Sequence, residues 1–239
     1  MAVDTSPKQD GLKVALDTVV APQAAFQSIR VAPTWGWAFL IVLVLFALGS
    51  YLITPANIHA LTADWPNVVA QSPALSGLSA DQQQAQLQVA IKVSAYAWIF
   101  VLIAVPIYLV IATVLYLIFD KIGHGDGSFG KYWAAATNVS IVAGLGNVVT
   151  GVITMIRGAD SFNRPMEVIT AMPSLALVAP QAGPKLVAIL GSVTPFSLWA
   201  IVLGYLALRE VGRVSQIPAG LGTIAAFLVP VLIGAAFAR

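Results

Sequence analysis

Five long stretches of uncharged, mostly apolar residues alternate with polar stretches along the chain. The apolar windows are Trp35–Thr54, Val93–Phe119, Tyr132–Ile156, Leu186–Leu208 and Val214–Ala238. Each has about 20 residues or more, which an α-helix needs to cross a hydrocarbon core of roughly 30 Å. Strands of a membrane barrel alternate apolar and polar residues, and these windows do not. The pattern predicts an all-α, polytopic integral membrane protein with a bundle of five transmembrane helices.

Composition supports a membrane protein and argues against a nucleic-acid binder. Of 239 residues, 59% are hydrophobic and 9% are charged, whereas a soluble domain carries roughly 25% charged residues. The net charge is +2, and the basic residues are scattered instead of gathered on one face. The chain has no cysteine, which excludes disulfides and Cys-ligated zinc.

The predicted domains are an N-terminal cytoplasmic or interfacial segment, residues 1–34, and a membrane domain, residues 35–239. Within the first, a short helix should begin at Pro22, because proline is favoured at the first helical position. Phe26 and Ile29 would share one of its faces. Two interpretations stay open: a helix lying in the membrane interface, or a connecting helix packed on the bundle.

Two polar stretches separate the spans on the side opposite the N-terminus. Residues 55–92 form the longer one, in which Ser79 and Gln82 predict a capping box and a helix that runs into the second span. Residues 157–185 contain four prolines and predict a loop with one short helix around Met166–Ala171. Inside the windows, Pro106, Pro195 and Pro230 predict kinks.

Lys and Arg counts in the loops give the expected orientation. With the N-terminus inside, seven of these residues lie on the inner side and five on the outer side. The sequence therefore favours a cytoplasmic N-terminus and an outer C-terminus at Arg239.

No ionisable residue falls inside the windows, so the polar candidates within the membrane are uncharged. The most polar positions are Asn138, Ser140 and Asn147 on the third span. Such asparagines favour hydrogen bonds across a helix interface, with a substrate pathway as the alternative.

Small residues recur every four positions on two spans, which lets helix backbones approach closely. The third span has Ala136, Ser140 and Gly144, beside Ala143, Asn147 and Gly151; the fifth has Gly222, Ala226, Pro230, Gly234 and Ala238. Close packing within one chain and a dimer contact are both consistent with these rows.

The glycine-rich stretch from Asp120 to Lys131 also holds His124 and Asp126, two more groups that ligate metals. A tight solvated turn is the simpler interpretation, because no second histidine is near. The chain lacks the common hydrolase and metalloprotease motifs. We therefore expect no catalytic, cofactor-binding or metal-binding residue, and no enzyme activity.

Three blocks in order resemble the Yip (Ypt/Rab-interacting protein) membrane domain family, in its bacterial-type form. They are VVAPQAAFQSIRVAPTWGWAFL (19–40), GHGDGSFGKYWAAAT (123–137) and TPFSLWAIVLGYLALREVGRVSQIPAGL (194–221). The resemblance implies five membrane helices and a cytoplasmic N-terminus, here in a bacterial cytoplasmic membrane. Eukaryotic members are associated with Rab GTPases and vesicle traffic, but this chain lacks their long cytosolic N-terminal region.

The structural candidates come from these blocks and from the small-residue rows. They are Pro22, Phe26, Gly123, Gly125, Phe129, Asn138, Gly144, Asn147, Pro195, Phe196, Trp199, Gly222 and Gly234. The expected function is a non-enzymatic membrane protein that organises the bilayer or adapts membrane-protein partners or a second copy of itself. The alternative is a small transporter or a lipid-moving protein. In that case helix unwinding would be expected near Gly191–Pro195, where Gly, Ser, Thr and Pro cluster.

Reporter fusions test the topology. Fusions at residues 10, 75, 126 and 170 should alternate in accessibility, because one predicted span separates each neighbouring pair, whereas residue 239 should share the side of residue 170, since two predicted spans lie between them. Positions 75 and 126 on the same side of the membrane would show that the number of spans is wrong.

Overall fold

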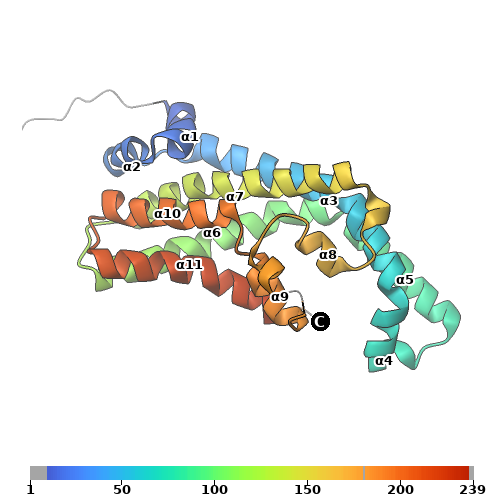
Figure 1. Ribbon diagram of the computed structural model, residues 1–239. Coiled ribbons are helices and arrows are strands. Elements are labelled where there is room, and N and C mark those ends of the chain that lie inside the picture. Colours follow the sequence, from blue (N-terminus) through green and yellow to red (C-terminus); the bar gives the residue numbers. More distant parts are fainter. Residues whose placement is uncertain (1–9, 180, 237–239) are drawn as a thin grey trace, which may run out of the picture. The chain divides into compact units, whose positions relative to one another are not determined.

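The computed structural model describes residues 10–179 and 181–236, and these residues form helices and no strands. Figure 1 shows the helices in chain order. They are α1 (Gly11–Val20), α2 (Pro22–Val31), α3 (Gly36–Gln71), α4 (Pro73–Ser76), α5 (Ala80–Ala95), α6 (Ala97–Ile122), α7 (Phe129–Arg157), α8 (Pro165–Ile169), α9 (Pro184–Gly191), α10 (Pro195–Val211) and α11 (Gln216–Ala236), with short 3-10 turns at Ala159–Ser161 and Leu175–Val178. The protein is thus an all-α, multi-pass membrane protein.

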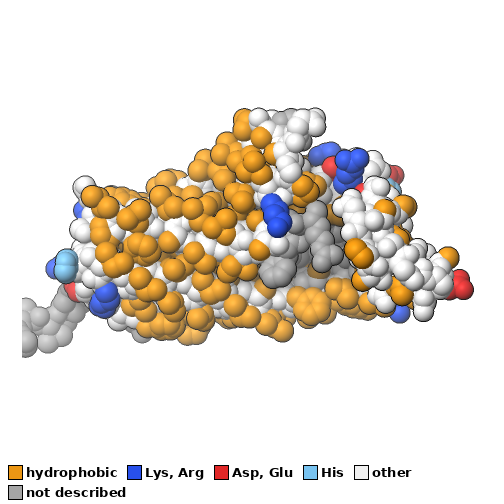
Figure 2. All heavy atoms as spheres, turned by 90° about the horizontal axis from the view of Figure 1, so that it is seen from below, with side chains coloured by type: hydrophobic (Ala, Val, Ile, Leu, Met, Phe, Trp, Pro, Cys, Tyr) orange, Lys and Arg blue, Asp and Glu red, His pale blue; other side chains and the backbone are white. Residues whose placement is uncertain are grey.

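Four helices are long and apolar enough to cross a membrane: α3, α6, α7 and α11. The fourth predicted window contains two helices, α9 and α10, which form a fifth span if the bent pair is counted as one. On the face drawn in Figure 2, hydrophobic side chains cover most of the surface and few charged side chains appear. This is the surface expected of helices whose solvent is lipid.

The break in the fourth window lies at Ser192–Thr194, where the sequence indicated a possible unwinding. The Ser192 and Val193 N–H groups still bond back to the end of α9, and Pro195 begins α10. Proline has no N–H to lose at a first helical position, which explains why the new helix begins there.

Residues 55–71 differ from the sequence prediction, because α3 continues through the stretch read as a polar loop. Pro55 and Pro66 both lie inside the helix. The helix is continued by packing: Ala56 and Ala60 form a buried cluster with Phe162 and Val168. Tertiary contact therefore outweighs the hydrogen bond that each proline removes.

The helix expected from Ser79 is present as α5. The Ser79 hydroxyl accepts from the Gln82 N–H, and the Gln82 side chain accepts from the Ser79 N–H, which completes the capping box. A one-residue interruption at Tyr96 separates α5 from α6. The short helix predicted around Met166–Ala171 is also present, as α8.

The N-terminal segment holds two helices where the sequence predicted one. The Asp10 carboxylate accepts from the Leu12 N–H and caps α1. Pro22 begins α2 as predicted, and Phe26 and Ile29 are fully buried. That burial shows a helix packed on protein through this face.

Contacts group the chain into two compact units, each assembled from three stretches. The first contains the chain up to Val44, Val105–Ala143 and Phe196–Val231; the second contains Leu45–Ala104, Gly144–Pro195 and the chain from Leu232. The first unit holds α1, α2, the start of α3, the later part of α6, the first half of α7, α10 from Phe196 onward and α11 up to Val231. All polypeptide connections predicted on the inner side thus belong to one unit.

The small-residue positions pack very differently from one another. In the second unit, a Cβ added at Gly144 would lie 2.9 Å from Leu45 Cβ, and one at Gly151 would lie 2.7 Å from Leu52 Cβ. In the first unit, a Cβ at Gly222 would lie 2.7 Å from Phe119 Cβ. The sequence predicted close helix packing at Gly234 as well, and this prediction is wrong: Gly234 is exposed, and no described atom lies within 4 Å of its added Cβ. Ala238, the last member of that row, and Arg239 lie outside the described residues.

Replacing Gly144 with Leu should lower stability, because the new side chain overlaps Leu45 and forces α3 and α7 apart. Overpacking of this kind costs about 1–3 kcal/mol. Gly234→Leu is the matched control and should leave thermal unfolding in detergent almost unchanged. Equal melting curves for Gly144→Leu and the wild type would contradict the packing assignment.

Candidate functional site

The most unusual polar group in the first unit is the carboxylate of Asp120. Asp120 lies in the last turn of α6 and is fully buried. The sequence window ended one residue earlier, at Phe119, and placed Asp120 in a solvated turn. Asp120 thus lies one residue beyond the uncharged window but within the same helix, and the interpretation of a solvated turn is wrong for this residue.

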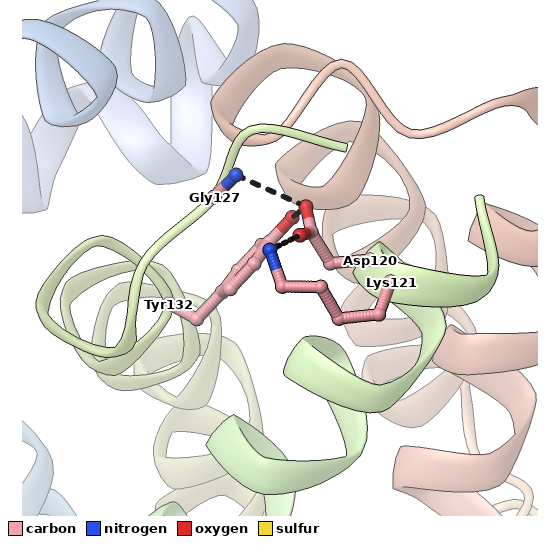
Figure 3. A network of polar contacts seen from close by, with 4 residues as sticks. All are labelled: Asp120, Lys121, Gly127 and Tyr132. Carbon is pink, nitrogen blue, oxygen red and sulfur yellow. Dashed lines mark hydrogen bonds and ion pairs between the residues drawn. The ribbon is translucent and has the colours of Figure 1, made fainter. Parts of the chain in front are cut away.

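Three groups surround this carboxylate, as Figure 3 shows. The Tyr132 hydroxyl donates to Oδ1 at 2.5 Å, and the Gly127 N–H donates to the same oxygen at 3.2 Å. The Lys121 ammonium lies 3.1 Å from Oδ2, although no described residue donates a well-aligned hydrogen bond to that atom. Donors replace the water that Oδ1 has lost, and the exposed ammonium of Lys121 balances the charge on Oδ2.

Glycines at two loops make room for the Asp120–Tyr132 pair. An added Cβ at Gly125 would overlap Asp120 Oδ1, one at Gly127 would overlap the Tyr132 ring, and one at Gly212 would overlap the Tyr132 hydroxyl. Any larger residue would therefore displace one of the two partners. The glycines between α6 and α7 therefore let the backbone approach this pair closely.

The same loop is joined to the connection between α10 and α11. The Asp126 N–H donates to the Gly212 carbonyl at 2.9 Å, and the Ser215 N–H donates to the Gly123 carbonyl at 3.4 Å. The Arg209 guanidinium of α10 donates to the Val214 carbonyl at 2.7 Å, within the connection between α10 and α11. Asp120 and Tyr132 are thus the centre of a junction between two loops that are distant in sequence.

The described polar groups of this junction are bound mainly to one another. Within residues 10–179 and 181–236, no group of three His, Asp or Glu side chains lies close enough to hold a metal ion. The Asp120 oxygen that faces Tyr132 is already engaged by two donors. The arrangement is that of a structural anchor which fixes the ends of α6, α7 and α10.

The two membrane asparagines make interhelical hydrogen bonds. The Asn138 amide donates to the Thr34 carbonyl at 3.2 Å, just before α3, and to the Ala134 carbonyl at 2.8 Å. The Asn147 amide donates to the Phe46 carbonyl of α3 at 3.0 Å. Both therefore join α7 to the α3 chain, each within its own unit.

A comparison with family models identifies the chain. The model described as the Yip1 domain matches residues 16–238. The chain belongs to this family. Comparison with curated proteins and with solved structures gave no match.

The junction combines two of the blocks that resemble the Yip1 domain. Gly123 and Gly125 come from the second block, and Gly212 comes from the third. Spacing alone did not reveal this pairing, since the two loops are separated by α7, α8, α9 and α10. The available signal was a lone carboxylate directly after an apolar window, followed by alternating glycines and an aromatic hydroxyl.

Other candidates of the Yip1 domain lie away from the junction. Phe129 is half exposed and stacks on Trp133, which also contacts Trp35 and Phe39. These four rings, here called the aromatic cluster, lie at the starts of α3 and α7. Phe196 and Trp199 lie in the first turns of α10, whereas the Asp120 junction contacts Gly212 after its last turn, so neither joins the junction.

Removing the Tyr132 hydroxyl tests the anchor in this Yip1 domain. Tyr132→Phe leaves the carboxylate with one hydrogen-bond donor fewer, and a bond to a charged group contributes about 1.5–3 kcal/mol. We expect a clear fall in thermal stability in detergent, and a smaller fall when the same change is made in Asp120→Asn. Tyr96→Phe is the control, since Tyr96 is 59% exposed. Additive effects of Tyr132→Phe and Asp120→Asn would contradict the anchor.

Proposed function

We propose that this Yip1 domain protein is a non-enzymatic membrane component that organises the bilayer or holds membrane-protein partners, without a transport cycle of its own. The observation that carries the proposal is the engagement of its intramembrane polar groups. Asn138 and Asn147 donate to backbone carbonyls on the α3 chain. Side chains used in this way hold helices together and are not available to solvate a passing ion.

The buried carboxylate supports the same conclusion. Coupled transporters bind ions or protons through intramembrane carboxylates that face a cavity or water path. Asp120 instead lies at a helix end, with Oδ1 held by Tyr132 and Gly127. A carboxylate with this role stabilises a loop junction.

A second candidate, a small transporter or lipid-moving protein, is favoured by one observation. The interruption between α9 and α10 resembles the discontinuous helices of transporters. However, the unwound backbone is engaged at Val193, whose carbonyl accepts from the Leu175 N–H at 3.1 Å. We therefore rank transport second.

The proposed setting is a bacterial cytoplasmic membrane with the N-terminus in the cytoplasm. The loops that belong to the first unit carry the larger number of basic residues, as the positive-inside rule requires of the cytoplasmic side. The partner is either another membrane protein or a second copy of the chain.

Reconstitution tests the absence of transport. Liposomes containing the wild-type protein should show no flux of ions or small polar solutes above empty vesicles, because Asn138 and Asn147 are engaged with backbone carbonyls of the α3 chain. Labelled phospholipid measures scrambling in the same vesicles. Scrambling that is lost in Asn147→Leu at unchanged folding would replace the proposed function with the second candidate.

A further inference from the structure

An open hollow in the first unit lies close to, but apart from, the Asp120 junction. Its volume is about 540 Å³, and Gln27, Arg30, Val31, Asp126 and Lys131 line it. The size falls within the roughly 300–1,000 Å³ of typical small-molecule sites. The end of α2, the loop before α7 and the first turn of α7 bring these residues together.

The position of the hollow along the helices indicates its depth in the membrane. Val31 is the last residue of α2, and a short connection leads from it to Gly36, where the spanning helix α3 begins. Lys131 lies in the first turn of another spanning helix, α7. The aromatic cluster occupies the same two helix starts, and such rings prefer the headgroup region. The hollow therefore opens at the level of lipid headgroups.

The charges in the hollow lack partners. Among the described residues the ion pair of Asp120 is with Lys121, and neither Arg30 nor Lys131 makes an ion pair or hydrogen bond. Among the residues that line the hollow, two cations face one carboxylate, that of Asp126, which leaves a net charge of one positive unit on the lining itself. A further carboxylate, Glu210, does not line the hollow and accepts from the Gln27 amide. A negative charge supplied from outside would therefore pair with the lining.

The remaining wall residues are suited to the rest of an amphiphilic ligand. Gln27 donates its amide N–H to Glu210 at 3.3 Å, which leaves its side-chain oxygen free to accept. That oxygen and the Asp126 carboxylate can accept hydrogen bonds from hydroxyl groups. Val31 is 65% exposed and offers an apolar surface beside Arg30.

We propose that this hollow binds the headgroup of an anionic phospholipid of the phosphoglycerol class. The guanidinium of Arg30 and the ammonium of Lys131 bind the phosphate. Gln27 and Asp126 accept from the glycerol hydroxyls, and Val31 contacts the start of an acyl chain. The site goes beyond the proposed function, since it specifies a lipid and does not depend on whether the protein has a protein partner.

Lipid binding to the full-length protein in mixed detergent micelles tests the proposal. Phosphatidylglycerol, phosphatidylcholine and phosphatidylethanolamine are titrated separately, and bound lipid is counted by native mass spectrometry. We expect a preference for phosphatidylglycerol that falls about fivefold for Arg30→Gln and about fivefold for Lys131→Gln, as expected for loss of one basic group near a membrane surface. Asp126→Asn should strengthen binding, because the amide oxygen can still accept from the glycerol hydroxyls while the charge that repels the phosphate is removed.

The matched control is the double variant Lys13→Gln with Arg213→Gln. Both side chains are exposed, belong to the first unit and lie outside the hollow, so the change in net charge equals that of Arg30→Gln with Lys131→Gln. Thermal unfolding establishes that each variant is folded. If the variant that combines Arg30→Gln and Lys131→Gln does not fold, the two single variants are compared with the control instead. An equal loss of binding in the control would show attraction by overall charge and overturn the site.

Two further arms identify the source of the phosphate. Inorganic phosphate and glycerol phosphate should not displace bound phosphatidylglycerol at equal concentration, because they lack the acyl contact with Val31. Displacement by either would assign the hollow to a soluble phosphate compound. Equal binding of phosphatidylethanolamine, or no preference over phosphatidylcholine, would overturn the anionic lipid.

Discussion

Burying the Asp120 carboxylate at the end of an apolar helix removes it from water, and the first unit is organised around replacing that water. An isolated buried charge costs several kcal/mol, so the side chain needs donors at fixed positions. Tyr132 and the Gly127 N–H supply them to one oxygen, and Lys121 balances the other. These donors in turn require backbone close by, which explains the glycines at 125, 127 and 212. The loop between α6 and α7 and the connection between α10 and α11 are thereby held in contact.

The same requirement governs α7 along its length. Polar side chains on this helix are satisfied either by their own helix or by the neighbouring α3 chain: Ser140 and Thr150 donate to carbonyls one turn earlier, while Asn138 and Asn147 reach across. Where they reach across, small residues let the backbones approach. A Cβ at Gly49 would lie only 2.7 Å from the backbone carbonyl carbon of Asn147. The close approach of the two backbones and the hydrogen bonds of the asparagines thus depend on each other, because the amide reaches the carbonyl only when the helices nearly touch.

The sequence predicted what depends on local chemistry and missed what depends on distant contacts. Span positions followed from uncharged length, and the Ser79–Gln82 capping box and the helix start at Pro22 followed from local hydrogen bonding. The continuation of α3 through Pro55 could not be predicted, since it depends on burial of Ala56 and Ala60 against Phe162. The Asp120 junction was missed for a related reason. A hydropathy window ends at the first charged residue, and only the tertiary structure shows that the Tyr132 hydroxyl donates to the Asp120 carboxylate.

The bonds between α3 and α7 also impose an order on how the protein is made. Asn138 and Thr34 are 104 residues apart, and Asn147 and Phe46 are 101 residues apart. At a synthesis rate of about 5–20 residues per second, α3 waits roughly 5–20 s in the membrane before its partner helix is complete. During that interval the close contact between Gly49 and Asn147 is not yet made, so lipid tails are the neighbours that this face of α3 has in the bilayer, and they must leave when α7 arrives. Biogenesis of this fold therefore includes a lateral exchange of lipid for protein, well after the first helix has entered the bilayer.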